Sequence, residues 1–120
     1  MYKKQQIRPF VGAIDFNRSR SFYADLGFTE TLLNEHLCLF TSDAVSFYLQ
    51  RDYVKDWVDN TMIFVEVDDA DRCYHDLEQL QLNSRYPEVR LEPVRRAVWG
   101  RECFLHDPSG ILWHFGTFHS

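Results

Sequence analysis

Cysteine is scarce in this 120-residue sequence, and the few residues present limit what the chain can be. Cys38, Cys73 and Cys103 form an odd set without any C-x-x-C pair. This pattern argues against a disulfide framework and against a structural zinc site. Each cysteine lies in an apolar or amphipathic stretch, so we expect three buried, reduced thiols that act as small hydrophobic side chains.

Long apolar runs and clusters of basic residues are also missing. No apolar run approaches the roughly 18 residues of a membrane span, and the polar first residues do not resemble an export signal. The net charge is −5, and the positive residues are scattered apart from two short pairs. Nucleic-acid binding needs a clustered basic surface. We therefore expect a cytoplasmic protein whose partners include neither nucleic acid nor membrane.

Aromatic residues, in contrast, are abundant. Phe, Tyr and Trp make up 16% of a chain whose hydrophobic and charged contents, 45% and 26%, are ordinary. The length predicts one domain spanning residues 1–120. Such a small domain does not need this many rings in its interior, so some are expected to line a pocket or a subunit interface.

Periodicity and turn residues predict two helices and eight strands. A first helix follows Asp15 or Asn17 as its cap and closes at Gly27, and a second follows Asp68-Asp69. The second helix buries a stripe that runs from Ala70 to Leu80. Segment 51–60 is a crossing between halves. The expected strands are 7–13, 29–33, 37–41, 44–50, 62–67, 89–93, 101–106 and 111–117.

This order of elements is β-α-β-β-β written twice. Residues at equivalent positions are similar too: Ile14-Asp15 matches Val67-Asp68, and Tyr23-x-Asp25-Leu26 matches Tyr74-x-Asp76-Leu77. The coincidences fall at equivalent points of both halves, which indicates an internal repeat. We expect an α+β fold made of two modules, at about 7–50 and 61–117.

Two segments carry a resemblance to a known family. Residues 14–28 combine an acidic cap with a helix that closes in Leu26-Gly27-Phe28, and residues 104–113 contain Asp107-Pro108-Ser109-Gly110. Both resemble signatures of the glyoxalase, bleomycin-resistance and extradiol dioxygenase superfamily, also called vicinal oxygen chelate. Asp56-Trp57 and Trp99-Gly100 favour the bleomycin-resistance branch. The resemblance implies a half-open concave barrel with the helices outside, and a homodimer whose subunits often share a cavity.

The resemblance also implies four metal-ligand positions on the concave face. Family enzymes place His, Glu, His or Gln, and Glu there, and the matching positions of this chain are Arg8, Tyr48, Met62 and His114. A shift of one residue would replace Tyr48 by Phe47. A guanidinium cannot ligate a cation, and a thioether is a poor partner for hard divalent ions. We therefore expect no metal and no other cofactor.

Strand alternation, with the family register, predicts which side chains face the concave side. The expected ligand-binding residues are Arg8, Phe10, Tyr48, Trp57, Met62, Phe64, Trp99 and His114. Arg8 either grips an anionic or carbonyl-bearing end of a ligand or pairs internally with Glu66 or a carboxylate of a partner chain. Trp57 and Trp99 either stack on a ligand or pack in the core or the dimer.

Three functions remain open at this level. The leading hypothesis is a metal-free binding protein of the bleomycin-resistance type, which sequesters a partly aromatic small molecule in a cavity at the dimer. The second is a glyoxalase- or dioxygenase-like lyase or oxidoreductase, either metal-dependent or using His114 as acid or base, with Glu66 as the one candidate orienting carboxylate. The third is a regulatory dimer with a vestigial cavity.

Overall fold

A computed structural model describes residues 1–119 of the chain. The first half contains β1 (Phe10–Gly12), α1 (Phe16–Leu26), β2 (Thr29–Asn34), β3 (Leu37–Ser42) and β4 (Val45–Gln50). A short helix, α2 (Lys55–Asp59), leads to the second half. The second half contains β5 (Met62–Glu66), α3 (Ala70–Gln79), the 3-10 helix η1 (Leu82–Ser84), β6 (Arg90–Arg96), β7 (Gly100–His106) and β8 (Leu112–Phe118).

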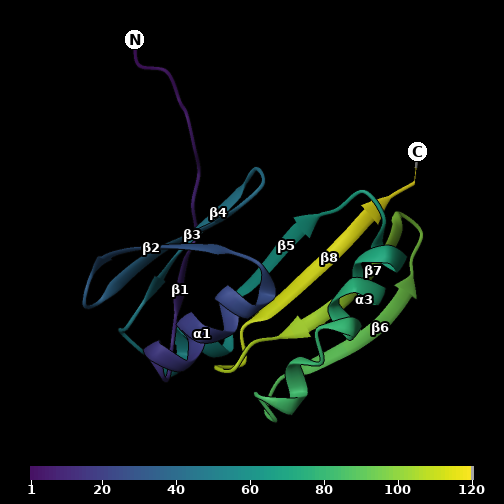
Figure 1. Ribbon diagram of the computed structural model, residues 1–120. Helices are drawn as coiled ribbons and strands as arrows, with labels where there is room; N and C mark the ends of the chain where they lie inside the picture. Colours follow the sequence, from purple (N-terminus) through teal and green to yellow (C-terminus); the bar gives the residue numbers. More distant parts are fainter. Residues whose placement is uncertain (120) are drawn as a thin grey trace.

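Both halves form four-stranded sheets with the same topology, which confirms the predicted α+β fold. Sheet A has the strand order β1-β4-β3-β2, and sheet B has the order β5-β8-β7-β6. In each sheet the first strand pairs parallel to the last strand of its half, and the other pairs are antiparallel. Figure 1 shows the sheets side by side, with α3 over one face of sheet B. The two sheets do not close into a barrel.

Local capping residues fix the ends of the two main helices. The Asp15 carboxylate accepts a hydrogen bond from the Arg18 amide at 3.1 Å, which satisfies one of the free amides at the start of α1. Gly27 closes α1 at φ 111°, a left-handed conformation that glycine adopts without steric cost. Asp69 caps α3 by accepting from the amides of Asp71 and Arg72. The sequence predicted both helix starts and the glycine stop.

Three predicted segments differ from the structure, and one of them, strand 89–93, is longer there as β6, which ends at Arg96. The expected strand 7–13 shrinks to β1, although the Pro9 carbonyl still accepts from the Tyr48 amide at 2.9 Å. Proline has no amide hydrogen to donate, so regular pairing begins only after it. Segment 51–60 contains α2, a turn and a half of helix that the sequence did not predict.

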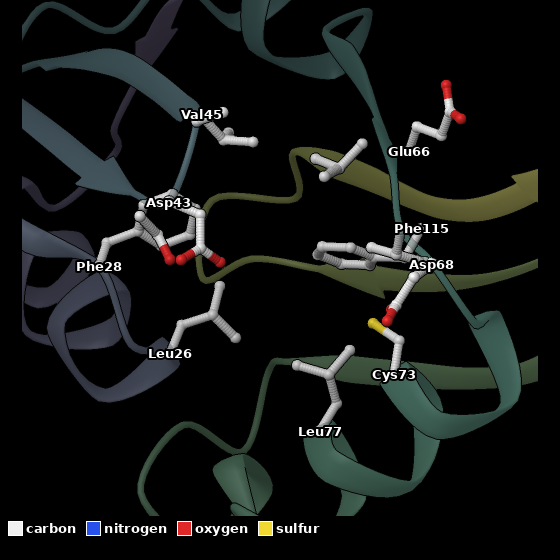
Figure 2. Close-up of a pocket in the computed structure, with 13 residues that line it drawn as sticks. Leu26, Phe28, Asp43, Val45, Glu66, Asp68, Cys73, Leu77 and Phe115 are labelled. Atoms are coloured by element: carbon white, nitrogen blue, oxygen red, sulfur yellow. The ribbon is translucent and has the colours of Figure 1, made fainter.

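The hydrophobic core lies on the helix side of both sheets. Phe47, Leu49 and Trp113 are fully or almost fully buried there, and the alternate residues of the same strands face the opposite side. This alternation confirms the predicted assignment of faces. The core does not close completely, because a hollow remains between the end of α1, the β3–β4 turn and α3 (Figure 2).

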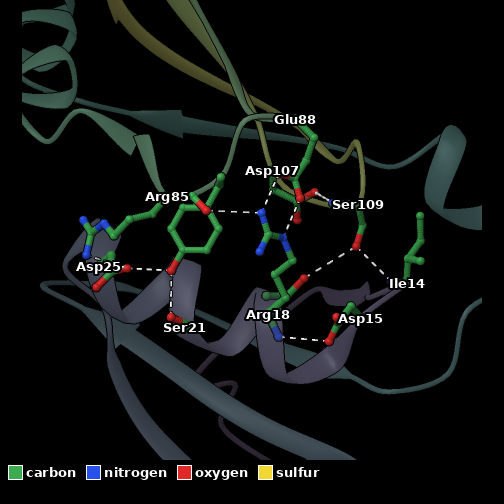
Figure 3. A network of polar contacts seen from close by, with 11 residues as sticks. Ile14, Asp15, Arg18, Ser21, Asp25, Arg85, Glu88, Asp107 and Ser109 are labelled. Atoms are coloured by element: carbon green, nitrogen blue, oxygen red, sulfur yellow. Dashed lines mark hydrogen bonds and ion pairs between the residues drawn. The ribbon is translucent and has the colours of Figure 1, made fainter. Parts of the chain in front are cut away.

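Polar contacts join α1 to the segment after η1 (Figure 3). The Arg18 guanidinium binds both carboxylate oxygens of Glu88, at 2.6 and 2.7 Å. Asp25 accepts a hydrogen bond from the Tyr86 hydroxyl at 2.6 Å and pairs with Arg85 at 3.0 Å. Because both ion pairs are partly exposed to solvent, they orient the two halves more than they stabilise them.

A buried polar triad joins the halves more tightly. The Tyr23 hydroxyl donates to the Asp107 carboxylate at 2.5 Å and accepts from the Trp113 indole at 2.9 Å. The other Asp107 oxygen accepts from the amides of Ser109 and Ile111, each at 2.8 Å. Burial raises the pKa of Asp107 from 3.8 to about 6, while the hydrogen bonds from Tyr23 and the amides oppose that rise. The Asp-Pro-Ser-Gly turn is therefore anchored to α1.

The prediction of three buried, reduced thiols is correct for two of the cysteines. Cys38 and Cys103 are buried, Cys73 is half-buried, and all three are free thiols. Within residues 1–119, no helix is long and apolar enough to cross a membrane.

Candidate functional site

The predicted ligand-binding residues fall into two clusters on the faces that point away from the helices. The first cluster lies on sheet A. Arg8 donates through Nε to the Ser46 hydroxyl at 2.9 Å, and its guanidinium carbon lies 5.9 Å from the centre of the Tyr48 ring. Phe10 packs on the same Tyr48 ring at a centroid distance of 4.9 Å. Within residues 1–119, Arg8 forms no ion pair, so Glu66 is not its partner.

Trp57 extends the first cluster from helix α2. Its side chain is 66% exposed and borders a hollow of about 270 Å³ together with Phe10 and Gln50. An exposed indole beside a hollow is unusual for a side chain that serves only the core. The position of Trp57 therefore suits contact with a ligand or with another chain.

The second cluster is an aromatic platform on sheet B, formed by Phe64, Trp99 and Phe118. Their ring centres lie 5.1 to 5.9 Å apart, so each ring contacts the other two. Gly116 lies beneath them, and a Cβ at that position would overlap the Phe64 ring. Phe64 and Phe118 are 44% and 50% exposed, and neighbouring Met62 is 65% exposed. A sheet face this apolar is a candidate binding surface.

His114 lies beside the aromatic platform and has an acidic partner. Its Nδ1 is 2.8 Å from a carboxylate oxygen of Glu102 on the adjacent strand. The ring stacks at 30° to Phe64 and meets Phe104 edge-on at 5.0 Å. A carboxylate at Nδ1 fixes the tautomer of a histidine and leaves Nε2 free to accept a proton or a hydrogen bond.

A second histidine and carboxylate pair lies further along the same face. His106 Nε2 is 2.9 Å from Glu92, and this contact lowers the pKa of the Glu92 carboxyl. The guanidinium of Arg95 stands over the Phe104 ring at 5.3 Å. Sheet B thus carries imidazoles, carboxylates and rings in adjacent rows, a mixture that suits an amphipathic organic molecule.

Comparison with solved structures places this geometry in a known fold. A bleomycin-binding protein from Streptomyces verticillus, complexed with copper(II)-bleomycin, superposes with a TM-score of 0.83 over 99% of this chain and 100% of that chain, at 24% identity. A glyoxalase/bleomycin resistance protein/dioxygenase from Nocardioides superposes with a TM-score of 0.70, at 16% identity, over 98% and 86%. The chain has the glyoxalase/bleomycin-resistance fold.

An antibiotic-binding protein from a Streptomyces species shares this fold, with a TM-score of 0.70, 17% identity and coverage of 99% of this chain and 100% of that chain. At the level of sequence the comparisons find less. No protein-family model matches the chain, and no curated protein matches it in a sequence search. The likeness therefore shows the glyoxalase/bleomycin-resistance fold alone.

The four metal-ligand positions that the family resemblance implies do not carry residues that suit a metal ion. At the four ligand positions, Arg8 is a cation, Tyr48 and Met62 offer only a phenol and a thioether, and His114 alone is a good ligand. Within residues 1–119, no group of three or more His, Cys, Asp and Glu side chains is arranged to hold a metal ion.

Sequence reasoning missed three residues of sheet B. Phe118 follows Leu112, His114 and Gly116 at period two, so alternation along β8 could have indicated it. Glu102 and Phe104 became visible only with the register of β7 against β8, which sets Glu102 opposite Gly116 and Phe104 opposite His114. The only candidate carboxylate in the sequence argument was Glu66, whereas Glu102 is the one that contacts His114.

Proposed function

We propose that this chain is a metal-free binding protein of the bleomycin-resistance type, forming one domain, which sequesters a partly aromatic organic ligand. The observation that carries the proposal is the exposed aromatic platform over Gly116. A flat ring of a ligand can stack there, because stacking on rigid exposed rings gains contact area at little entropic cost. Two proteins of this fold, a bleomycin-binding protein and an antibiotic-binding protein, add support.

The ligand cavity is proposed to lie between two subunits of a homodimer. Phe10, Trp57, Met62 and Phe64 are each between 44% and 66% exposed in the single chain, and a second subunit would cover them. In this arrangement sheet A of one chain faces sheet B of the other. Arg8 would then grip an anionic or carbonyl-bearing end of a ligand whose ring rests on the platform.

Binding is tested first with metal-free bleomycin and a panel of aromatic antibiotics, measured by the rise in melting temperature at saturating ligand. Trp99→Ala should weaken binding of any hit by tenfold or more, on the order of 1.4 kcal/mol, because truncating a stacked indole removes a dominant contact. Tyr2→Ala, an exposed ring outside both clusters, is the matched control. If no ligand of the panel raises the melting temperature, the binding proposal fails.

The shared cavity is tested by mixing two variants. Trp57→Ala and Trp99→Ala homodimers each carry two damaged sites, whichever chain supplies each ring. After unfolding and refolding together, mixed dimers regain one intact site only if the two clusters of a site come from different subunits. Binding should then return at about a quarter of all sites. No recovery, or a monomer in sedimentation equilibrium, would contradict the shared cavity.

An enzyme remains a second candidate because of the 2.8 Å contact between His114 and Glu102. A histidine held by a carboxylate can act as general base through Nε2 in a lyase or an oxidoreductase. The test is mass spectrometry of each bound compound after incubation with the protein. Turnover that His114→Asn abolishes, while binding persists, would establish the enzyme. Unchanged ligand would exclude turnover of the tested compounds.

A further inference from the structure

The hollow on the helix side of the molecule is separate from both clusters of the concave faces. It has a volume of about 490 Å³, which is in the range of sites for small organic molecules. Figure 2 shows it between the end of α1 and the start of α3, with strands β4, β5 and β8 behind. We call it the convex hollow. None of the eight residues proposed to bind the aromatic ligand lines it.

The body of the convex hollow is apolar. Leu26 and Phe28 come from the end of α1 and the residue before β2, Val45 begins β4, and Leu77 and Phe115 face them from α3 and β8. Val45 and Phe28 are only partly buried although they lie on the helix side of the molecule. The core therefore leaves apolar surface here that a ligand of matching shape would cover.

The rim of the convex hollow is acidic. Asp43 lies in the β3–β4 turn and Asp68 precedes α3, and Figure 2 shows both carboxylates directed towards the hollow while Glu66 points away from it. Neither Asp43 nor Asp68 forms an ion pair with any residue in the range 1–119. Asp68 also lines an adjoining hollow, together with Arg72 and Asp76, and no ion pair joins these three residues, all of which the structure describes.

We propose that the convex hollow binds a small organic cation that carries an apolar body, such as a primary amine with an alkyl or phenyl tail. The tail would fill the apolar body of the hollow, and the ammonium group would lie between the Asp43 and Asp68 carboxylates. The net charge of −5 adds a general attraction for cations. The amine is distinct from the proposed aromatic ligand and binds on the opposite side of sheet B.

Cys73 supplies a local reporter for this site. It lines the convex hollow and is half-buried, whereas Cys38 and Cys103 are fully buried. The contact with Cys103 and, after it, burial raise the pKa of the Cys73 thiol, so the thiol reacts slowly and its rate of alkylation can be followed. A molecule in the convex hollow would shield Cys73 from a neutral alkylating reagent.

The experiment measures binding of phenylbutylamine by calorimetry, with phenylbutanol as the uncharged isostere. The amine should bind about fivefold or more tightly than the alcohol, because two partly solvated carboxylates each add a modest attraction. At saturation the amine should slow the alkylation of Cys73 by N-ethylmaleimide, read by peptide mass mapping. Equal affinity of amine and alcohol, or unprotected Cys73, would overturn the proposal.

Matched variants separate this site from general charge effects. Asp43→Asn and Asp68→Asn should each weaken amine binding about two- to fivefold and leave alcohol binding unchanged. Asparagine suits Asp43 because that residue has φ 51°, which asparagine tolerates. Glu35→Gln removes one charge from an exposed hairpin and should change nothing. Trp99→Ala should also leave amine binding intact, so failure here is distinguishable from failure of the proposed aromatic site.

Discussion

Tyr23→Phe is the substitution that tests the buried triad most directly. The change deletes one oxygen and keeps the ring that packs against Phe47 and Trp113 at 4.9 and 5.7 Å. Two groups lose their partner at once. The Asp107 carboxylate loses its hydroxyl donor, and the indole N–H of fully buried Trp113 loses its only acceptor within residues 1–119.

The expected loss of stability is about 3 to 5 kcal/mol. A hydrogen bond to a charged group contributes roughly 1.5 to 3 kcal/mol, and a buried donor left without an acceptor costs about 1 to 3 kcal/mol. No cavity larger than a hydroxyl forms, so packing adds little. For a domain whose total stability is on the order of 5 to 15 kcal/mol, this change is large.

The assay is equilibrium unfolding in urea, followed by the fluorescence of the tryptophans and by circular dichroism. Tyr53→Phe is the matched control, because Tyr53 is 40% exposed and its hydroxyl has no hydrogen bond within residues 1–119; its effect should stay below about 0.5 kcal/mol. A loss below about 1 kcal/mol for Tyr23→Phe would refute the reasoning, since neither buried group would then depend on the hydroxyl.

Three further predictions follow from individual positions. Asp107 has a folded pKa of about 6, above the unfolded value near 3.8, so its stabilising effect is complete below about pH 4 and is lost as pH rises through 6. The free energy of unfolding of the unsubstituted protein should therefore fall between pH 4 and pH 7, and in Asp107→Asn this fall should be smaller by about 2 to 3 kcal/mol. An equally large fall in the variant would contradict the raised pKa of Asp107. Gly116→Ala should destabilise the chain by about 1 to 3 kcal/mol in urea and displace Phe64 and Trp99, visible as altered near-ultraviolet dichroism. Gly27→Ala should lower the free energy of unfolding by about 1 kcal/mol, because an alanine at φ 111° is strained. No loss of stability would contradict the left-handed end of α1.

The features that could be predicted from the sequence are those that depend on neighbours along the chain. Asp15 and Gly27 define α1 because a cap and a left-handed stop act within one helical turn. Alternation separated Phe47 and Leu49 from Tyr48 because the side-chain period of a strand is two. Repetition of these local signals gave the two halves their common element order. The exceptions include β1, which was predicted too long where Pro9 interrupts pairing, and α2, which was not predicted.

The pairing of segments far apart in sequence could not be predicted in the same way. Glu102 reaches His114 because β7 and β8 are adjacent antiparallel strands in one particular register, and a shift of one residue would place them on opposite faces. The ring of Phe64 could rest on Gly116 only once β5 paired with β8. Asp43 and Asp68 border one hollow because the two halves pack through Tyr23 and Asp107. By itself the sequence determined the elements and their faces, since these follow from local backbone geometry, whereas contacts between the faces were decided by strand register and packing in the tertiary structure.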